Sequence, residues 1–162
     1  VEALTGSDRL QRCLTAAYRY LGYRPRSESE IRERMQRRGF DGETIDAVVA
    51  RLQEQNLLDD HAFAQFWKEN RESFSPRSQW LTRRELKRMG VVNDVAEQVV
   101  AGMDDEANAY RAALQKTRRG APADYQDFRR RLGDYLRRRG FNYEVIVHTL
   151  EKVWQELGSS PG

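Results

Sequence analysis

The chain has 162 residues, of which 39% are hydrophobic and 33% are charged, a balance that predicts either one ordinary domain or an array of smaller units with a strongly solvated surface. Cys13 is the single cysteine, which excludes an internal disulfide, and with His61 and His148 it cannot supply the four ligands of a structural zinc site. No stretch approaches the roughly 18 to 20 apolar residues of a membrane helix. We therefore expect a cytoplasmic protein without metal or cofactor and, because it begins with Val1, one cut from a longer chain.

The first predicted helices lie before residue 58. Residues 9–21 form a helical stretch in which Cys13 is expected to be a buried, inert thiol. Ser27 and Glu30 have the spacing of a capping box, which predicts that a second helix begins there. A third helix is predicted by apolar residues at the i, i+3, i+4, i+7 spacing of one buried stripe: Ile45, Val48, Val49 and Leu52.

The next predicted helix covers residues 59–74 and opens with two adjacent aspartates. Either Asp59 or Asp60 is expected to cap this helix, and Phe63 is expected to face the core. The two carboxylates beside His61 could instead suggest metal or acid-base chemistry. Neighbouring helix positions diverge by about 100°, however, which disfavours a shared ion.

The last predicted helices follow residue 104. A helical stretch covers residues 105–119, a loop covers 117–123, and a further helix places Phe128, Leu132 and Leu136 on one face. No segment alternates apolar and polar residues for long enough to predict a strand.

A basic segment that ends in glycine occurs three times. Gly39, Gly90 and Gly140 lie 51 and 50 residues apart, each where a helix end calls for a positive φ. The residues expected to cap the helices that follow are Asp41, Asn93 and Asn142. The fold class predicted is all-α, with three tandem three-helix repeats in an elongated, curved array. The expected limits are 1–58, 59–104 and 105–157, with a flexible tail at 158–162.

The arginines suggest a binding surface. Arginine supplies 24 of the 28 basic residues, which codon bias could explain, yet residues 111–139 carry ten basic residues against three acidic ones in a chain whose net charge is +3. Spacings of seven place Arg130 with Arg137, and Arg131 with Arg138, on one helix face, a ridge suited to phosphates or to an acidic protein groove. A solvated face without a partner, or cations that offset the helix dipole, would explain the pattern equally simply. The candidate binding residues in this region are Arg118, Arg119, Arg129, Arg130, Arg131, Arg137 and Arg138.

A second, weaker basic patch lies in the middle repeat. It consists of Arg77, Arg83, Arg84, Lys87 and Arg88, of which the last four are candidate binding residues. Trp80 lies among them and could stack on a nucleic-acid base, but a tryptophan on a helix is more often a core residue, and we expect Trp80 to be one.

Several motifs, in order along the chain, resemble the RecX family. They are Arg26-Ser27-Glu28-x-Glu30, Arg38-Gly39-Phe40-Asp41, Leu57-Leu58-Asp59-Asp60-x-Ala62-Phe63-Ala64, Glu85-Leu86-x-x-x-Gly90-Val91 and Arg138-Arg139-Gly140-Phe141-x-Tyr143. The resemblance covers about residues 10–157. One departure is the segment from Pro76 to Glu85, which is about three residues longer than in the family pattern.

This resemblance implies three three-helix repeats and a regulator of the RecA recombinase. Such a protein would bind within the groove of the RecA filament on DNA, inhibit strand exchange, ATP hydrolysis and co-protease activity, and have no enzyme activity of its own. We expect it to be a monomer that contacts RecA and single-stranded or double-stranded DNA, away from membranes. The first alternative is a sequence-independent DNA-binding helical protein that acts without RecA. The second is a helical scaffold for an acidic protein, without affinity for nucleic acid.

Overall fold

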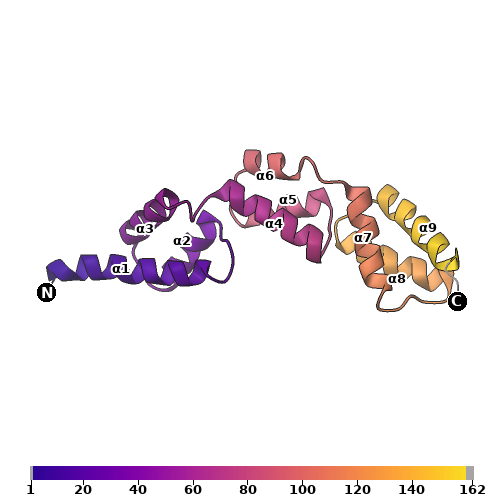
Figure 1. Cartoon of the computed structure of the whole chain (residues 1–162), viewed down its shortest axis with the longest axis horizontal. Coiled ribbons are helices and arrows are strands. Elements are labelled where there is room, and N and C mark those ends of the chain that lie inside the picture. The colour runs from indigo at the N-terminus through magenta and orange to yellow at the C-terminus, as the bar shows by residue number, and fades with distance from the viewer. Residues whose placement is uncertain (1, 160–162) are drawn as a thin grey trace. The chain divides into compact units, whose positions relative to one another are not determined.

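The computed structural model describes residues 2–159, with side chains from 6 to 158, and this part of the chain contains nine α-helices and no strand (Figure 1). The all-α prediction is confirmed. The helices are α1 (Glu2–Leu21), α2 (Glu28–Arg37), α3 (Gly42–Glu54), α4 (Asp60–Phe74), α5 (Gln79–Arg88), α6 (Asn93–Val100), α7 (Asp105–Thr117), α8 (Tyr125–Arg138) and α9 (Tyr143–Ser159).

The helices follow one another in three sets of three. The predicted turn glycines end the second helix of each set, with φ of 90° at Gly39, 84° at Gly90 and 90° at Gly140. The limits at residues 58 and 104 stay a prediction. Of the predicted tail, Gly158 and Ser159 belong to α9, and residues 160–162 lie outside the described residues.

The chain divides into two compact units that share the middle repeat. One unit comprises the residues up to Trp67 together with Leu86–Val99, and the other comprises Lys68–Glu85 together with the residues from Val100 onward. Each unit therefore contains one terminal repeat and the part of the middle repeat that packs on it.

In the first unit, the predicted stripe of α3 is the core. Ile45, Val48, Val49 and Leu52 are buried and pack with the buried residues Ile31 and Met35 of α2 and with α1. Cys13 of α1 is fully buried, and burial raises the pKa of its thiol to about 11. An inert thiol follows, because only the thiolate reacts.

In the second unit, small residues of α7 allow α9 to approach closely. Ala109, Ala112 and Ala113 are fully buried against the apolar faces of α8 and α9. Phe128 of α8 packs on Trp154 of α9 with ring centroids 4.9 Å apart. The fold thus holds α8 by one apolar face and leaves its other face to solvent.

The helix caps agree with the sequence in most places. The capping box of Ser27 and Glu30 is present, Asp59 Oδ1 accepts the backbone N–H groups of His61 and Ala62, and Asn142 Oδ1 accepts that of Val145. Asp41 precedes α3 but its carboxylate bonds Thr44 Oγ1 rather than the backbone. The prediction for Asn93 was wrong: α6 begins at Asn93 itself, because the carbonyl of Val92 already accepts the first helical bond, from Ala96.

The two inner junctions between repeats use equivalent positions. In the first unit, Ser27 Oγ donates to the carbonyl of Met89 at 2.6 Å, and the backbone N–H of Glu28 donates to Asp60 Oδ1 at 2.9 Å. In the second unit, the N–H of Ser78 donates to the carbonyl of Arg139 at 3.0 Å, and the N–H of Gln79 donates to Asp105 Oδ1 at 2.8 Å. The start of one repeat's second helix is therefore capped by the next repeat.

Candidate functional site

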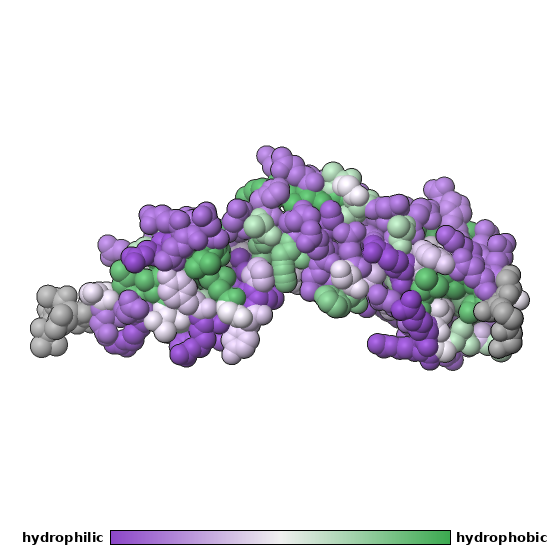
Figure 2. Space-filling model, in the orientation of Figure 1, coloured by the Kyte–Doolittle hydropathy of each residue, from purple (hydrophilic) through white to green (hydrophobic). Residues whose placement is uncertain are grey.

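The predicted ridge lies on α8. Phe128, Leu132 and Leu136 are buried, so the helix presents its opposite face to solvent, as the sevenfold spacing predicts. The arginines on the exposed side are Arg129, Arg130, Arg131, Arg137 and Arg138. Hydrophilic residues also cover most of the molecular face shown in Figure 2, where apolar residues form only small patches.

The arginines differ in whether acidic neighbours neutralise them. Arg130 and Arg131 both bond Asp127, at 2.6 and 3.1 Å, and Arg137 bonds Asp134 at 3.1 Å. Among the side chains that the structure describes, the candidate arginines of the third repeat that have no ion pair are Arg118, Arg119, Arg129 and Arg138. Exposed ion pairs contribute little to stability because water screens them. The paired arginines Arg130, Arg131 and Arg137 can therefore also bind a partner.

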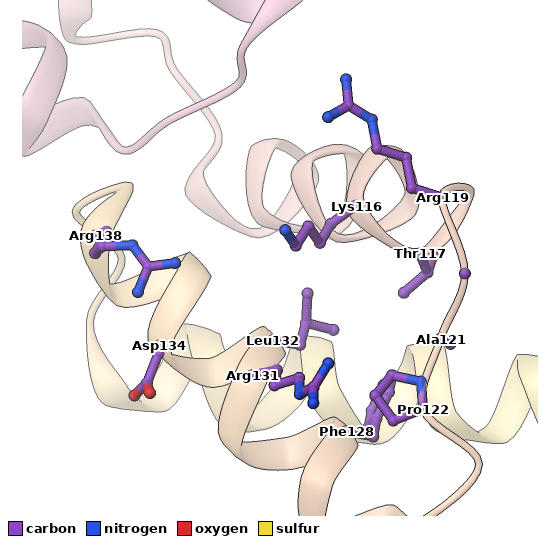
Figure 3. A pocket seen from close by; sticks show the side chains of 11 residues that line it. Lys116, Thr117, Arg119, Ala121, Pro122, Phe128, Arg131, Leu132, Asp134 and Arg138 are labelled. Carbon is purple, nitrogen blue, oxygen red and sulfur yellow. The ribbon is translucent and has the colours of Figure 1, made fainter.

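A pocket of about 360 Å³ lies between α7, the loop that follows it, and α8. Lys116 and Arg119 line it from one side and Arg131 and Arg138 from the other. In Figure 3, Leu132 lies between Lys116 and Arg131. Positive charge thus surrounds an apolar floor, a combination that accepts an anionic group beside an apolar one.

The loop between α7 and α8 closes one end of this pocket. Gly120 has a φ of 111°, which only glycine adopts without strain, and Ala121 and Pro122 complete the wall. Asp134 also lines the pocket, but its carboxylate bonds Arg137. The structure therefore brings Arg119, Arg131 and Arg138 together, whereas the other predicted residues of the ridge do not line the pocket.

On α5, the expectation for Trp80 was wrong. Trp80 is 53% exposed, because the buried positions of this helix are Thr82 and Leu86, and Trp80 falls on another face. The guanidinium of Arg84 lies 5.3 Å from the Trp80 ring centroid, a cation–π contact. Arg84, Lys87 and Arg88 are exposed, whereas Arg83 is half-buried. The expectation that Arg77 belongs to this patch was wrong, because Arg77 is buried and pairs with Glu85.

A second cationic groove, which the sequence had not led us to expect, lies in the first unit. Arg9, Arg12 and Arg19 of α1 and Arg38 near the end of α2 line a hollow of about 610 Å³. The signal was available, because positions 9, 12 and 19 differ by three and seven residues and so share one helix face.

The aspartate pair at the start of α4 serves capping. Asp59 caps its own helix, while Asp60 points to the backbone of α2; burial raises the pKa of Asp60, and the bond from Glu28 N–H opposes that shift. No cluster of metal-ligating side chains occurs among the described residues. In the same part of the chain, no helix combines the length and hydropathy that crossing a bilayer requires.

Comparison with known proteins gives consistent matches. The family described as "RecX, first three-helix domain" matches residues 13–52, and "RecX, third three-helix domain" matches residues 104–155. Regulatory protein RecX of Prosthecochloris aestuarii is 36% identical over 143 residues, which are 88% of this chain and 94% of that protein. Its counterpart in Chlorobaculum tepidum is 33% identical and covers 88% of this chain and 89% of that protein. The crystal structure of RecX from Lactobacillus salivarius has a TM-score of 0.70 at 18% identity, over 90% of this chain and 97% of that one.

Proposed function

The chain belongs to the RecX family of regulatory proteins, and we propose that it is a non-catalytic regulator that binds RecA and its filament on DNA. In this proposal it inhibits strand exchange, ATP hydrolysis and co-protease activity. It works as a monomer in the cytoplasm, where RecA filaments form.

The observation that carries the proposal is the group of arginines on α8 and in the loop before it. Arg118, Arg119, Arg129 and Arg138 are exposed and have no ion pair among the described side chains, and three further arginines continue the surface along α8. Arginine bonds phosphates and carboxylates through two parallel N–H groups. A filament of protein on DNA offers both kinds of anion.

The test is the DNA-dependent ATPase of RecA on single-stranded DNA. The wild-type chain is expected to suppress ATP hydrolysis at near-stoichiometric ratios. The variant with Arg130→Glu and Arg131→Glu is expected to keep its helicity, since both side chains are exposed, but to lose inhibition and filament binding. Full inhibition by the variant would show that the arginines of α8 are not needed for inhibition. Absence of inhibition by saturating wild-type protein would refute the proposed function.

A second candidate is a sequence-independent DNA-binding protein that acts without RecA. The exposed Trp80, with Arg84 over its ring, favours it, because aromatic rings that accept stacked bases beside a cation are typical of single-strand binding. Such binding should weaken steeply with salt, with a slope of about 0.7 per phosphate contact on single strands, whether or not RecA is present. Binding that requires RecA would exclude this candidate.

A further inference from the structure

At each inner junction, one repeat presents the start of its second helix to the next repeat, and in the second unit the end of the first helix and the turn that follows it also take part. At the junction in the second unit, the presented surface consists of Glu72, Ser75, Ser78 and Leu81. Glu72 lies 3.7 Å from Arg111, Ser75 Oγ accepts a hydrogen bond from Arg139, and Ser78 N–H bonds the Arg139 carbonyl. Gly140 packs so closely that a methyl group on it would lie 2.8 Å from Leu81 Cβ.

The third repeat has an equivalent surface, and no helix among the described residues docks on it. Gly90 and Gly140 are 50 residues apart, so Ser78 and Leu81 correspond to Phe128 and Arg131. Asp60 and Asp105 begin equivalent helices, so Glu72 and Ser75 correspond to Thr117 and Gly120. Phe128, Arg131, Thr117 and Gly120 all line the 360 Å³ pocket. The pocket is therefore the place that a following repeat would occupy.

The charge of this surface is reversed relative to the inner junction. The middle repeat offers the acidic Glu72 to the basic Arg111. The third repeat instead offers Lys116, Arg119, Arg131 and Arg138. A partner with acidic side chains satisfies this surface, whereas one with the basic side chains of the inner junction does not.

The helix start has changed as well. α2 and α5 begin 11 residues before their turn glycines, whereas α8 begins 15 residues before Gly140. Asp124 Oδ2 caps α8 from within its own repeat, through the N–H of Asp127. At the inner junctions a backbone N–H at the start of the second helix donates to Asp60 or Asp105. The equivalent N–H in the third repeat lies inside α8, so the donors that this surface presents are arginine side chains.

We propose that this open end of the third repeat is a docking site for an acidic segment of a protein partner, with an apolar side chain seated on Phe128 and Leu132. The proposal rests on the proposed function, because it assigns part of the same arginine surface to protein carboxylates rather than to DNA phosphates. A protein segment is favoured because this surface binds protein at the inner junctions.

A second copy of this chain is excluded as the occupant by charge. The face that it would insert contains the turn at Gly39, where a methyl group would meet no described atom within 4 Å. The charged residues that line that face are four arginines and one acid: Arg9, Arg12, Arg19, Arg38 and Asp41. Two arginine-rich surfaces repel each other.

The test uses two fluorescent probes with equal negative charge, a glutamate peptide with leucine at every fourth position and an oligothymidylate. Anisotropy is measured with the full chain, the pocket variant R131E/R138E, and the control variant R37E/R51E, which makes the same charge change on exposed residues of the first unit. The peptide is expected to bind the wild type and the control alike and the pocket variant about tenfold more weakly. R131Q/R138Q, which adds no charge, replaces the pocket variant if circular dichroism shows a loss of helicity.

Three results would overturn the proposal: no binding of the peptide to the wild type, an equal loss in both variants, or displacement of the peptide by oligothymidylate at equal concentration. Inhibition of RecA ATP hydrolysis is measured on the same samples. Peptide binding that depends on the pocket, in a protein that does not inhibit RecA, would refute the proposed function and leave the docking site standing.

Discussion

Replacing each turn glycine by alanine separates backbone strain from packing between repeats. All three glycines have φ near +90°, so alanine at any of them costs about 1 kcal/mol of left-handed strain. Gly39 has open space around it, whereas a methyl group on Gly90 would overlap Ser29 Oγ and Cβ, and one on Gly140 would overlap Ser78 Oγ and crowd Leu81 Cβ.

The crowding adds to the strain at the two inner glycines. Rotation of Ser29 does not relieve the overlap, since its Cβ is involved. Movement of Ser78 breaks the hydrogen bond that the N–H of Leu81 donates to Ser78 Oγ, which caps α5. Overfilling a packed site costs about 1 to 3 kcal/mol. We therefore expect a loss of about 1 kcal/mol for Gly39→Ala and about 2 to 4 kcal/mol for Gly90→Ala and Gly140→Ala.

Thermal unfolding followed by circular dichroism measures these losses. For a chain of this length, 1 kcal/mol lowers Tm by about 2 to 4 °C, so Gly39→Ala is expected to lower Tm by about 3 °C and each inner variant by about 6 to 12 °C. Equal losses at all three positions would refute the reasoning, because strain alone would then account for them. In the Gly90→Ala background, Ser29→Gly is expected to recover part of the loss.

Three more outcomes are expected. Because the pKa of Cys13 is about 11, about a thousandth of its thiol is ionised at pH 8, and a disulfide reagent should modify it only as fast as the first repeat opens. Fast modification of the native protein would contradict the burial of Cys13. The bond to Glu106 raises the pKa of His148 above its ordinary 6.5, so this pair's stabilisation is fully present below pH 6.5 and is lost as pH rises through the folded pKa; an NMR titration should show a lower pKa in Glu106→Gln. Trp80→Ala should change stability by less than about 0.5 kcal/mol, whereas Trp154→Ala, which removes the ring on Phe128 and Tyr125, should cost about 3 kcal/mol; similar losses would contradict the exposed position of Trp80.

The sequence predicts what depends on local pattern. The stripe of α3, the box of Ser27 and Glu30 and the positive φ of Gly140 each follow from residues within a few positions of one another. The exposure of Trp80 does not, because it depends on the burial of Thr82 and Ser78, two polar residues whose hydroxyls bond the backbone. A hydropathy pattern assigns such residues to solvent and the tryptophan to the core.

The pocket could not be predicted from the sequence, because it depends on where α8 begins. The sequence shows which basic and apolar residues are present, but these residues form a pocket only because α8 begins about one turn earlier than the second helices of the other two repeats. Asp124 caps α8 at that position. The ion pairs of Asp127 with Arg130 and Arg131 could have been predicted, because the two arginines lie three and four positions after Asp127, where ion pairs form on a helix.

The abundance of arginine does not by itself indicate a binding surface, because many arginines here hold the fold together. Arg77 is 8% exposed and pairs with Glu85 between α5 and the turn before it; burial lowers its pKa, and Glu85 opposes that shift. Arg24 pairs with Glu30 at 2.6 Å and lies over the Trp67 ring. Since each such arginine already has an internal partner, the residues that distinguish a binding surface are those without one. In the third repeat these are Arg118, Arg119, Arg129 and Arg138. Two of them, Arg119 and Arg138, line the same open pocket, and codon bias, which supplies arginine everywhere, does not account for that placement.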